Sequence, residues 1–231
     1  MYKVLLFDID GTLLDFDHDM EIAFRHMYTV SGLENAKPLT RELMEIYEVG
    51  NLRWWRRFEQ GLCEKTELYN RRFEDFFEAA GLPYVDPNLL NSIYFDALGQ
   101  SGTFYPGAEA MLAALAEKYP IYIITNGNAP SQKTRMALSG LNRYIQGYFI
   151  SEAIGAAKPD KRYFDYVLAH IPGARAQDCI VIGDSLTSDM RGAVNAGMDS
   201  IWFNPKHLEN TIAVPVTYEA ADFDDILHIL L

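Results

Sequence analysis

Four short apolar runs in this sequence are each followed closely by side chains that could take part in catalysis. The first run leads into two aspartates separated by one residue, and the last leads into two more. The second ends in a threonine next to Asn-Gly, and the third is followed by a lysine before proline. These residues are Asp8 and Asp10, Asp184 and Asp189, Thr125, Asn126 and Gly127, and Lys158. Since the carboxyl ends of parallel strands meet at one edge of a sheet, we expect them to converge there.

The carboxylates of Asp8, Asp10 and Asp184 would repel one another strongly in such a small volume. A hard divalent cation removes this conflict. Mg²⁺ takes oxygen ligands and binds through one or two carboxylates together with a phosphate oxygen. These residues therefore predict a magnesium site and a phosphoryl-transfer reaction.

The two aspartates of the first motif need different roles. Asp8, at the end of the strand, is placed to attack phosphorus and to form an aspartyl-phosphate. Asp10 is placed to protonate the leaving oxygen and then to deprotonate the attacking water. Lys158 and the backbone N–H groups that follow Thr125 would hold the other phosphoryl oxygens. The hydroxyl of Thr12 would orient the loop.

Each of these residues also has an ordinary structural explanation. The first aspartate pair could be a solvated strand-end turn, Thr125 could open a common Asn-Gly turn, and Lys158 could lie on the surface. Asp184 could cap the helix that follows it. Asp189 could occupy the first turns of that helix because acids are favoured there. The occurrence of all four groups together favours the catalytic explanation.

The runs that position these residues are continuously apolar, which is typical of strands in a parallel sheet covered on both faces. The expected strands are 3–7, 120–125, 147–151, 179–183 and 200–203, and the expected helices around them are 107–118, 130–141, 160–171, 186–196 and 222–231. Alternation of strands and helices with short links predicts an α/β fold with a doubly wound parallel sheet.

The interval 15–102 differs, because it contains several helical patterns and no strand-like run. Turn signals separate these helices. We therefore expect an all-helical domain at 15–102, inserted into a core domain that comprises 1–14 and 103–231. In this insert, the adjacent Trp54 and Trp55 must point in different directions on a helix. One would pack in the core, and the other could stack on a base.

The amino-acid composition excludes some classes of binding partner for this protein. The chain has 231 residues and a net charge of −12, which argues against binding to nucleic acid polymers or anionic membranes. No run is long enough to span a membrane, and two distant cysteines suit a reducing compartment, so we expect a cytoplasmic protein. The sequence leaves the oligomeric state open.

The segments DIDGT, ITNG, AAKPD and GDSLTSD, in this order, resemble the four signature motifs of the haloacid dehalogenase (HAD) superfamily of phosphatases. The resemblance spans residues 4–205. It implies a Rossmann-like core and identifies the helical insert with that superfamily's C1-type cap. It also implies hydrolysis of phosphomonoesters through an aspartyl-phosphate.

Carried over residue by residue, the resemblance implies Asp8 as nucleophile and Asp10 as acid and base. Thr125 and Lys158 would bind and neutralise the phosphoryl group. Mg²⁺ would bind to Asp8, to the backbone carbonyl of Asp10 and to Asp184. Asp189 would support the site by holding a metal-bound water or the lysine.

Longer segments, including NGNAPSQKTRMALSGL and IGDSLTSDMRGAVNAGMDSIWFNP, resemble the noncanonical pyrimidine 5′-nucleotidases of that superfamily. This resemblance implies a role in nucleotide metabolism, with nucleoside monophosphates as substrates. In the insert it extends to the residues Asn51, Trp55, Arg72 and Phe73, which we expect to set substrate specificity. The alternatives are a phosphatase of another small metabolite, such as phosphoglycolate or a sugar phosphate, and a non-catalytic ligand-binding protein of the same fold.

Overall fold

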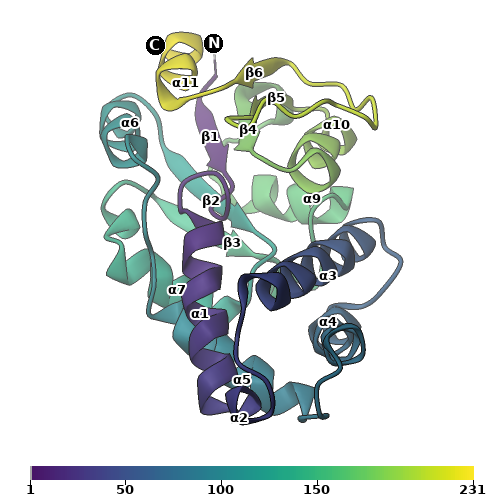
Figure 1. Ribbon diagram of the computed structural model, residues 1–231. Helices are drawn as coiled ribbons and strands as arrows, with labels where there is room; N and C mark the ends of the chain where they lie inside the picture. Colours follow the sequence, from purple (N-terminus) through teal and green to yellow (C-terminus); the bar gives the residue numbers. More distant parts are fainter. Residues whose placement is uncertain (1) are drawn as a thin grey trace. The chain divides into compact units, whose positions relative to one another are not determined.

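The structure is a computed structural model that describes residues 2–231 (Figure 1). Its contacts divide the chain into two compact units. The core unit runs up to Phe16 and resumes at Gly102–Leu231, and the helical unit is Asp17–Ser101. These divisions fall within two residues of the boundaries expected for the core and the insert.

The core unit is built on one parallel sheet of six strands in the order β3-β2-β1-β4-β5-β6. The strands are β1 (Val4–Phe7), β2 (Ile121–Thr125), β3 (Gly147–Ile150), β4 (Cys179–Gly183), β5 (Asp199–Phe203) and β6 (Tyr218–Ala220). This order confirms the doubly wound α/β fold. The direction of winding reverses between β1 and β4, which pair side by side, and such a switch point is where ligands bind in these sheets.

Both faces of the sheet are covered, because each central strand is apolar on both sides. Leu5 and Phe7 pack on one face, against α6 (Ala108–Ala116), α7 (Ala129–Leu138) and α11 (Phe223–Leu230). Val4 and Leu6 pack on the other, against α9 (Lys161–His170) and α10 (Arg191–Ala196). Successive strand residues point to opposite faces, so an unbroken apolar run is what a buried strand requires.

The helical unit contains five helices: α1 (Phe16–Val30), α2 (Leu33–Ala36), α3 (Arg41–Glu59), α4 (Lys65–Ala80) and α5 (Pro87–Gly99). Local signals set their ends. The hydroxyl of Thr40 accepts from the N–H of Leu43 at the start of α3, and Gly81 ends α4 in the left-handed conformation. Aromatic rings fill the interior, with Phe24 stacked on Tyr47 at 4.1 Å between ring centres.

The structure differs from the expected elements in three places. Strand β6 was not expected, because its three residues are mostly exposed and follow a long loop without an apolar run. The expected helix 186–196 begins as a π-helical turn, η3 (Leu186–Met190), before α10. Helix α3 includes most of the segment LTRELMEIYEV (39–49), whose helical pattern contributed to the predicted insert, and continues ten residues beyond it. The remaining short elements are α8 (Ser151–Ile154), η1 (Leu141–Arg143) and η2 (Ala176–Asp178).

None of the helices formed by residues 2–231 has the length and apolar character needed to cross a membrane.

Candidate active site

Asp8 is the first residue beyond β1, and its carboxylate is held from two sides. Its backbone N–H donates to the carbonyl of Ile182 on β4 at 2.8 Å, which extends the strand pairing by one residue. The side chain is almost fully buried. Its Oδ1 accepts a hydrogen bond from the Lys158 ammonium at 2.5 Å, and its Oδ2 faces the hydroxyl of Thr12 at 3.4 Å. The strand end thus presents an oriented carboxylate.

Lys158 is also buried, and each of its three ammonium hydrogens has an acceptor. Besides Asp8, Nζ donates to Oδ1 of Asp189 at 2.7 Å and to the carbonyl of Ile124 at 3.0 Å. Its backbone is fixed by the amide of Asn126, which accepts from the Lys158 N–H at 3.0 Å and donates to the Lys158 carbonyl at 2.9 Å. The Asn-Gly sequence after β2 is therefore more than a turn, because it ties the lysine loop to that strand.

The charges of this cluster are not balanced. Burial raises the pKa of Asp8 to about 8; Lys158 opposes this effect, whereas Asp189 and Asp10 add to it. Burial by itself would lower the pKa of Lys158, but Asp189 and Asp8 outweigh that effect and raise it. Lys158 therefore stays protonated at neutral pH, and the ionised form of Asp8 requires more positive charge than this lysine supplies.

Thr125 ends β2 and is buried, and its hydroxyl oxygen accepts two hydrogen bonds. One comes from the N–H of Gly127 at 3.0 Å and the other from Nε2 of Gln132 at 3.2 Å. A hydroxyl has two lone pairs and one hydrogen, so both accepting positions are used and the hydrogen is left to donate. That suits a phosphoryl oxygen as partner. The N–H of Gly127, which we expected to bind the phosphoryl group, donates to Thr125 instead.

Asp184 and Asp189 follow β4, the strand beside β1. The chain between them enters the π-helical turn η3, and turns of this kind are frequent at functional sites. Asp189 is fully buried within the turn. It lies so close to Gly183 that a Cβ atom placed there would overlap its carboxyl group. The glycine at the end of β4 therefore makes room for Asp189 to reach Lys158.

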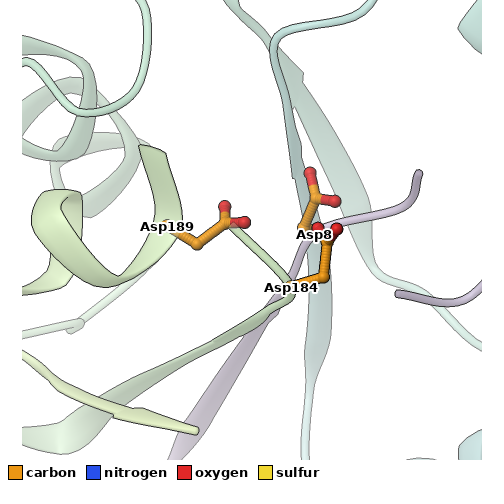
Figure 2. Close-up of side chains that lie close together, drawn as sticks. All are labelled: Asp8, Asp184 and Asp189. Atoms are coloured by element: carbon orange, nitrogen blue, oxygen red, sulfur yellow. The ribbon is translucent and has the colours of Figure 1, made fainter. Parts of the chain in front are cut away.

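Asp8, Asp184 and Asp189 can each place one oxygen within 4.8 Å of the other two, and Figure 2 shows their side chains gathered at the end of β1. The backbone conformation of Gly11 is left-handed, and a Cβ atom there would lie 2.6 Å from Oδ2 of Asp184. The indole N–H of Trp202 donates to the Asp184 carbonyl at 2.9 Å. Three carboxylates against one lysine, with oxygen donors only, fit a hard divalent cation such as Mg²⁺.

The side chain of Asp10 lies outside that group of three, and both of its oxygens are engaged by helix α7. Nε2 of Gln132 donates to Oδ2 at 2.5 Å, and the guanidinium of Arg135 forms an ion pair with Oδ1. Gln132 and Arg135 are buried. These two residues were not among those predicted from the sequence. The sequence feature that could have identified them is a pair of long polar side chains on the helix face that packs on the sheet and should be apolar.

The residues expected to set specificity lie in the helical unit, on α3 and α4. Arg72 donates to Oδ1 of Asn51 at 3.1 Å and to Oδ1 of Asn91, on α5, at 2.8 Å. Its guanidinium lies over the rings of Tyr94 and Phe73, 4.7 and 4.8 Å from their centres. Arg72 is buried, and among residues 2–231 no carboxylate forms an ion pair with it.

The aromatic residues that are candidates for substrate contact in the helical unit differ in how deeply they are buried. Trp54 is the core tryptophan, and its indole N–H donates to Asp75 at 2.8 Å. Trp55 is only partly buried and lies edge-on to Tyr69, with 6.4 Å between ring centres. Phe73 is fully buried. Its ring packs in the interior beneath the Arg72 guanidinium, and its role in substrate specificity stays a prediction.

Residues 2–197 match the haloacid dehalogenase-like hydrolase family, so the chain belongs to that family. It is 37% identical to the pyrimidine 5′-nucleotidase PynA of Streptococcus pneumoniae, over 99% of this chain and 95% of that protein. It is 30% identical to the pyrimidine 5′-nucleotidase YjjG of Escherichia coli, over 98% and 96%. The magnesium-bound crystal structure of the HAD-hydrolase YfnB from Bacillus subtilis matches with a TM-score of 0.92 at 35% identity, covering 99% of this chain and 98% of that one.

Proposed function

We propose that this protein is a phosphoric monoester hydrolase that works through an aspartyl-phosphate on Asp8. One observation carries the proposal. The buried Asp8 carboxylate stands at the switch point of the sheet, paired with Lys158 and grouped with Asp184 and Asp189. Membership of the HAD-like hydrolase family supports the same chemistry.

The reaction has two steps. In the first, a carboxylate oxygen of Asp8 bonds to phosphorus while the bond from phosphorus to the leaving oxygen breaks, and Asp10 gives that oxygen a proton. In the second, Asp10 takes a proton from a water molecule whose oxygen bonds to phosphorus, and the bond between phosphorus and Asp8 breaks. Lys158 and the hydroxyl of Thr125 offset the negative charge of the phosphoryl oxygens.

Mg²⁺ would be held by Asp8, Asp184 and the backbone carbonyl of Asp10, with Asp189 in support. When bound, the cation reduces the repulsion between the Asp8 carboxylate and a phosphate dianion. The oxygen donors and the surplus negative charge of the site support this choice. So does the magnesium bound to the relative YfnB.

For the substrate we propose a nucleoside 5′-monophosphate with a pyrimidine base. Two relatives named pyrimidine 5′-nucleotidases match over nearly the full chain. In the helical unit, Oδ1 of Asn51 accepts from Arg72, while among residues 2–231 its Nδ2 has the sulfur of Met20, a weak acceptor, as its partner at 3.9 Å. Asn51 would donate to a keto oxygen of the base, Arg72 would position Asn51, and the partly exposed Trp55 would stack on the base.

The variant Asp8→Asn tests the proposed chemistry. We expect release of phosphate from uridine 5′-monophosphate and from p-nitrophenyl phosphate to fall by more than about 10³-fold, since the nucleophile is lost. Circular dichroism should show an intact fold. The matched control is Asp165→Asn, an exposed aspartate on α9, which should keep full activity. Substantial turnover by Asp8→Asn would disprove the mechanism.

A substrate panel separates the remaining alternatives. It comprises uridine, cytidine and adenosine 5′-monophosphates, ribose 5-phosphate and phosphoglycolate, each with Mg²⁺. We expect the highest kcat/KM for the pyrimidine nucleotides. A preference for a sugar phosphate or phosphoglycolate would overturn the substrate assignment and leave the phosphatase chemistry standing. Hydrolysis of none of them would indicate a non-catalytic binding protein.

A further inference from the structure

Helix α7 carries two buried polar side chains that point at the acid–base residue of the core unit. Gln132 and Arg135 are three residues apart and therefore lie on one face of the helix. Their exposed fractions are 2% and 0%. A buried amide and a buried guanidinium destabilise a fold unless they are paired, so their partners reveal their purpose.

Those partners include the two oxygens of Asp10. Gln132 donates to Oδ2 and Arg135 to Oδ1, so each oxygen receives its own donor. The two donors are also joined, because Arg135 donates to Oε1 of Gln132 at 3.3 Å. Two donors on two oxygens fix both the position of the carboxyl group and the rotation of its plane. The Asp10 side chain nevertheless keeps 24% of its surface exposed, so a substrate can reach it.

Gln132 has a second contact that extends the network. The same Nε2 donates to the hydroxyl oxygen of Thr125, the residue that ends β2. Gln132 therefore links the group that would handle protons to the group that would bind the phosphoryl oxygens. Space for it comes from Gly127, where a Cβ atom would overlap the Gln132 side chain.

We propose that Gln132 and Arg135 are positioning residues that hold Asp10 for proton transfer to the leaving oxygen. The inference rests on the proposed function, in which Asp10 is the acid and base. It predicts a dependence on the leaving group. An alcohol leaving group, such as the 5′-oxygen of a nucleoside, requires a proton as its bond to phosphorus breaks. The p-nitrophenolate ion leaves readily without one.

The test compares kcat/KM for uridine 5′-monophosphate and p-nitrophenyl phosphate in Gln132→Met and Arg135→Met, which keep side-chain length but cannot donate. We expect a fall of roughly 10- to 100-fold for the nucleotide and of less than about threefold for the aryl phosphate. Arg135→Lys should recover part of the loss because it restores a cationic donor. Lys133→Met, an exposed cation on the same helix, is the matched control and should behave as the wild type.

An equal loss with both substrates, or no loss with either, would overturn the proposal, because a merely structural role does not distinguish leaving groups. A second measurement separates this outcome from failure of the proposed function. Crystal structures of the two methionine variants should show the Asp10 carboxyl group turned from its present orientation. If it keeps that orientation, the positioning role is wrong whatever the enzyme hydrolyses. If the wild type hydrolyses neither ester, the proposed function fails, and so does the proton-transfer role that rests on it.

Discussion

Three glycines, which have no side chain, are as important for the geometry of this site as its reactive residues. Gly11 leaves room for Asp184, Gly127 for Gln132, and Gly183 for Asp189. In each case a single Cβ atom would collide with a polar group that contacts the site. The close spacing of the carboxylates and their donors therefore depends on glycine at these strand-end turns.

Gly127→Ala tests this dependence at the scale of one methyl group. The added Cβ should push the Gln132 side chain away from Asp10 and Thr125. We therefore expect kcat/KM for uridine 5′-monophosphate to fall about tenfold or more, with a smaller effect on p-nitrophenyl phosphate, as for Gln132→Met.

The control is Gly50→Ala, in the interior of helix α3. A Cβ atom at Gly50 meets nothing within 4 Å. This variant should keep its activity and gain about 0.5–1 kcal/mol of stability, because alanine is the better helix former. Equal activity of Gly127→Ala and the wild type would show that Gln132 does not need its present position.

At the scale of elements, strand ends and short helical turns deliver the reactive groups. Strands β1 and β4 lie side by side, so the residues that follow them are neighbours although about 175 positions separate them. The π-helical turn η3 then places Asp189 against Lys158, and helix α7 brings Gln132 and Arg135 to Asp10. Each group is thus positioned by a different element.

In the helical unit, three helices are tied together by Arg72, which bridges Asn51 on α3 and Asn91 on α5. We expect Asn51→Ala to lower kcat/KM for uridine 5′-monophosphate by roughly three- to tenfold, the loss of one hydrogen bond. Ribose 5-phosphate, which has no base, should be hydrolysed at an unchanged rate.

Asn35→Ala, at an exposed position of α2, is the matched control for this experiment. If Asn51→Ala slows both substrates equally, Asn51 serves the packing of the helices rather than recognition of the base.

At the scale of the whole molecule, the chain carries a net charge of −12 and concentrates part of it where three carboxylates meet. A cation bound there stabilises the folded state, because the unfolded chain has no such site. At about 100 times its dissociation constant, Mg²⁺ should add about 2.7 kcal/mol to the free energy of unfolding. The midpoint of thermal unfolding should rise by roughly 5–10 °C.

This shift is measured by calorimetry against NaCl of equal ionic strength, which corrects for general screening of the acidic surface. Asp184→Asn, which removes one carboxylate from the group, should reduce the shift to a small fraction of the wild-type value. A shift of the same size in both proteins would place the bound cation elsewhere.

Much of this arrangement could be predicted from the sequence, because strands buried on both faces must be continuously apolar and parallel strands end at a common edge. Five of the six strands and the grouping of Asp8 with Asp184 follow from those two rules, and the helical insert follows from its helical patterns and the absence of a strand-like run. Local signals did not reveal strand β6, since three exposed residues carry no pattern. They also did not indicate which tryptophan is buried, because that depends on the neighbouring helices.

The amino-acid sequence by itself determined the fold class and the order of the motifs, since both depend on periodicity and on residue types at strand ends. Only the tertiary structure decided the partners of the polar side chains. The donors to Asp10 lie more than 120 positions away on α7, and the carboxylates around Lys158 come from two segments that follow different strands. Such pairings depend on how elements pack in three dimensions, and spacing along the chain does not encode them.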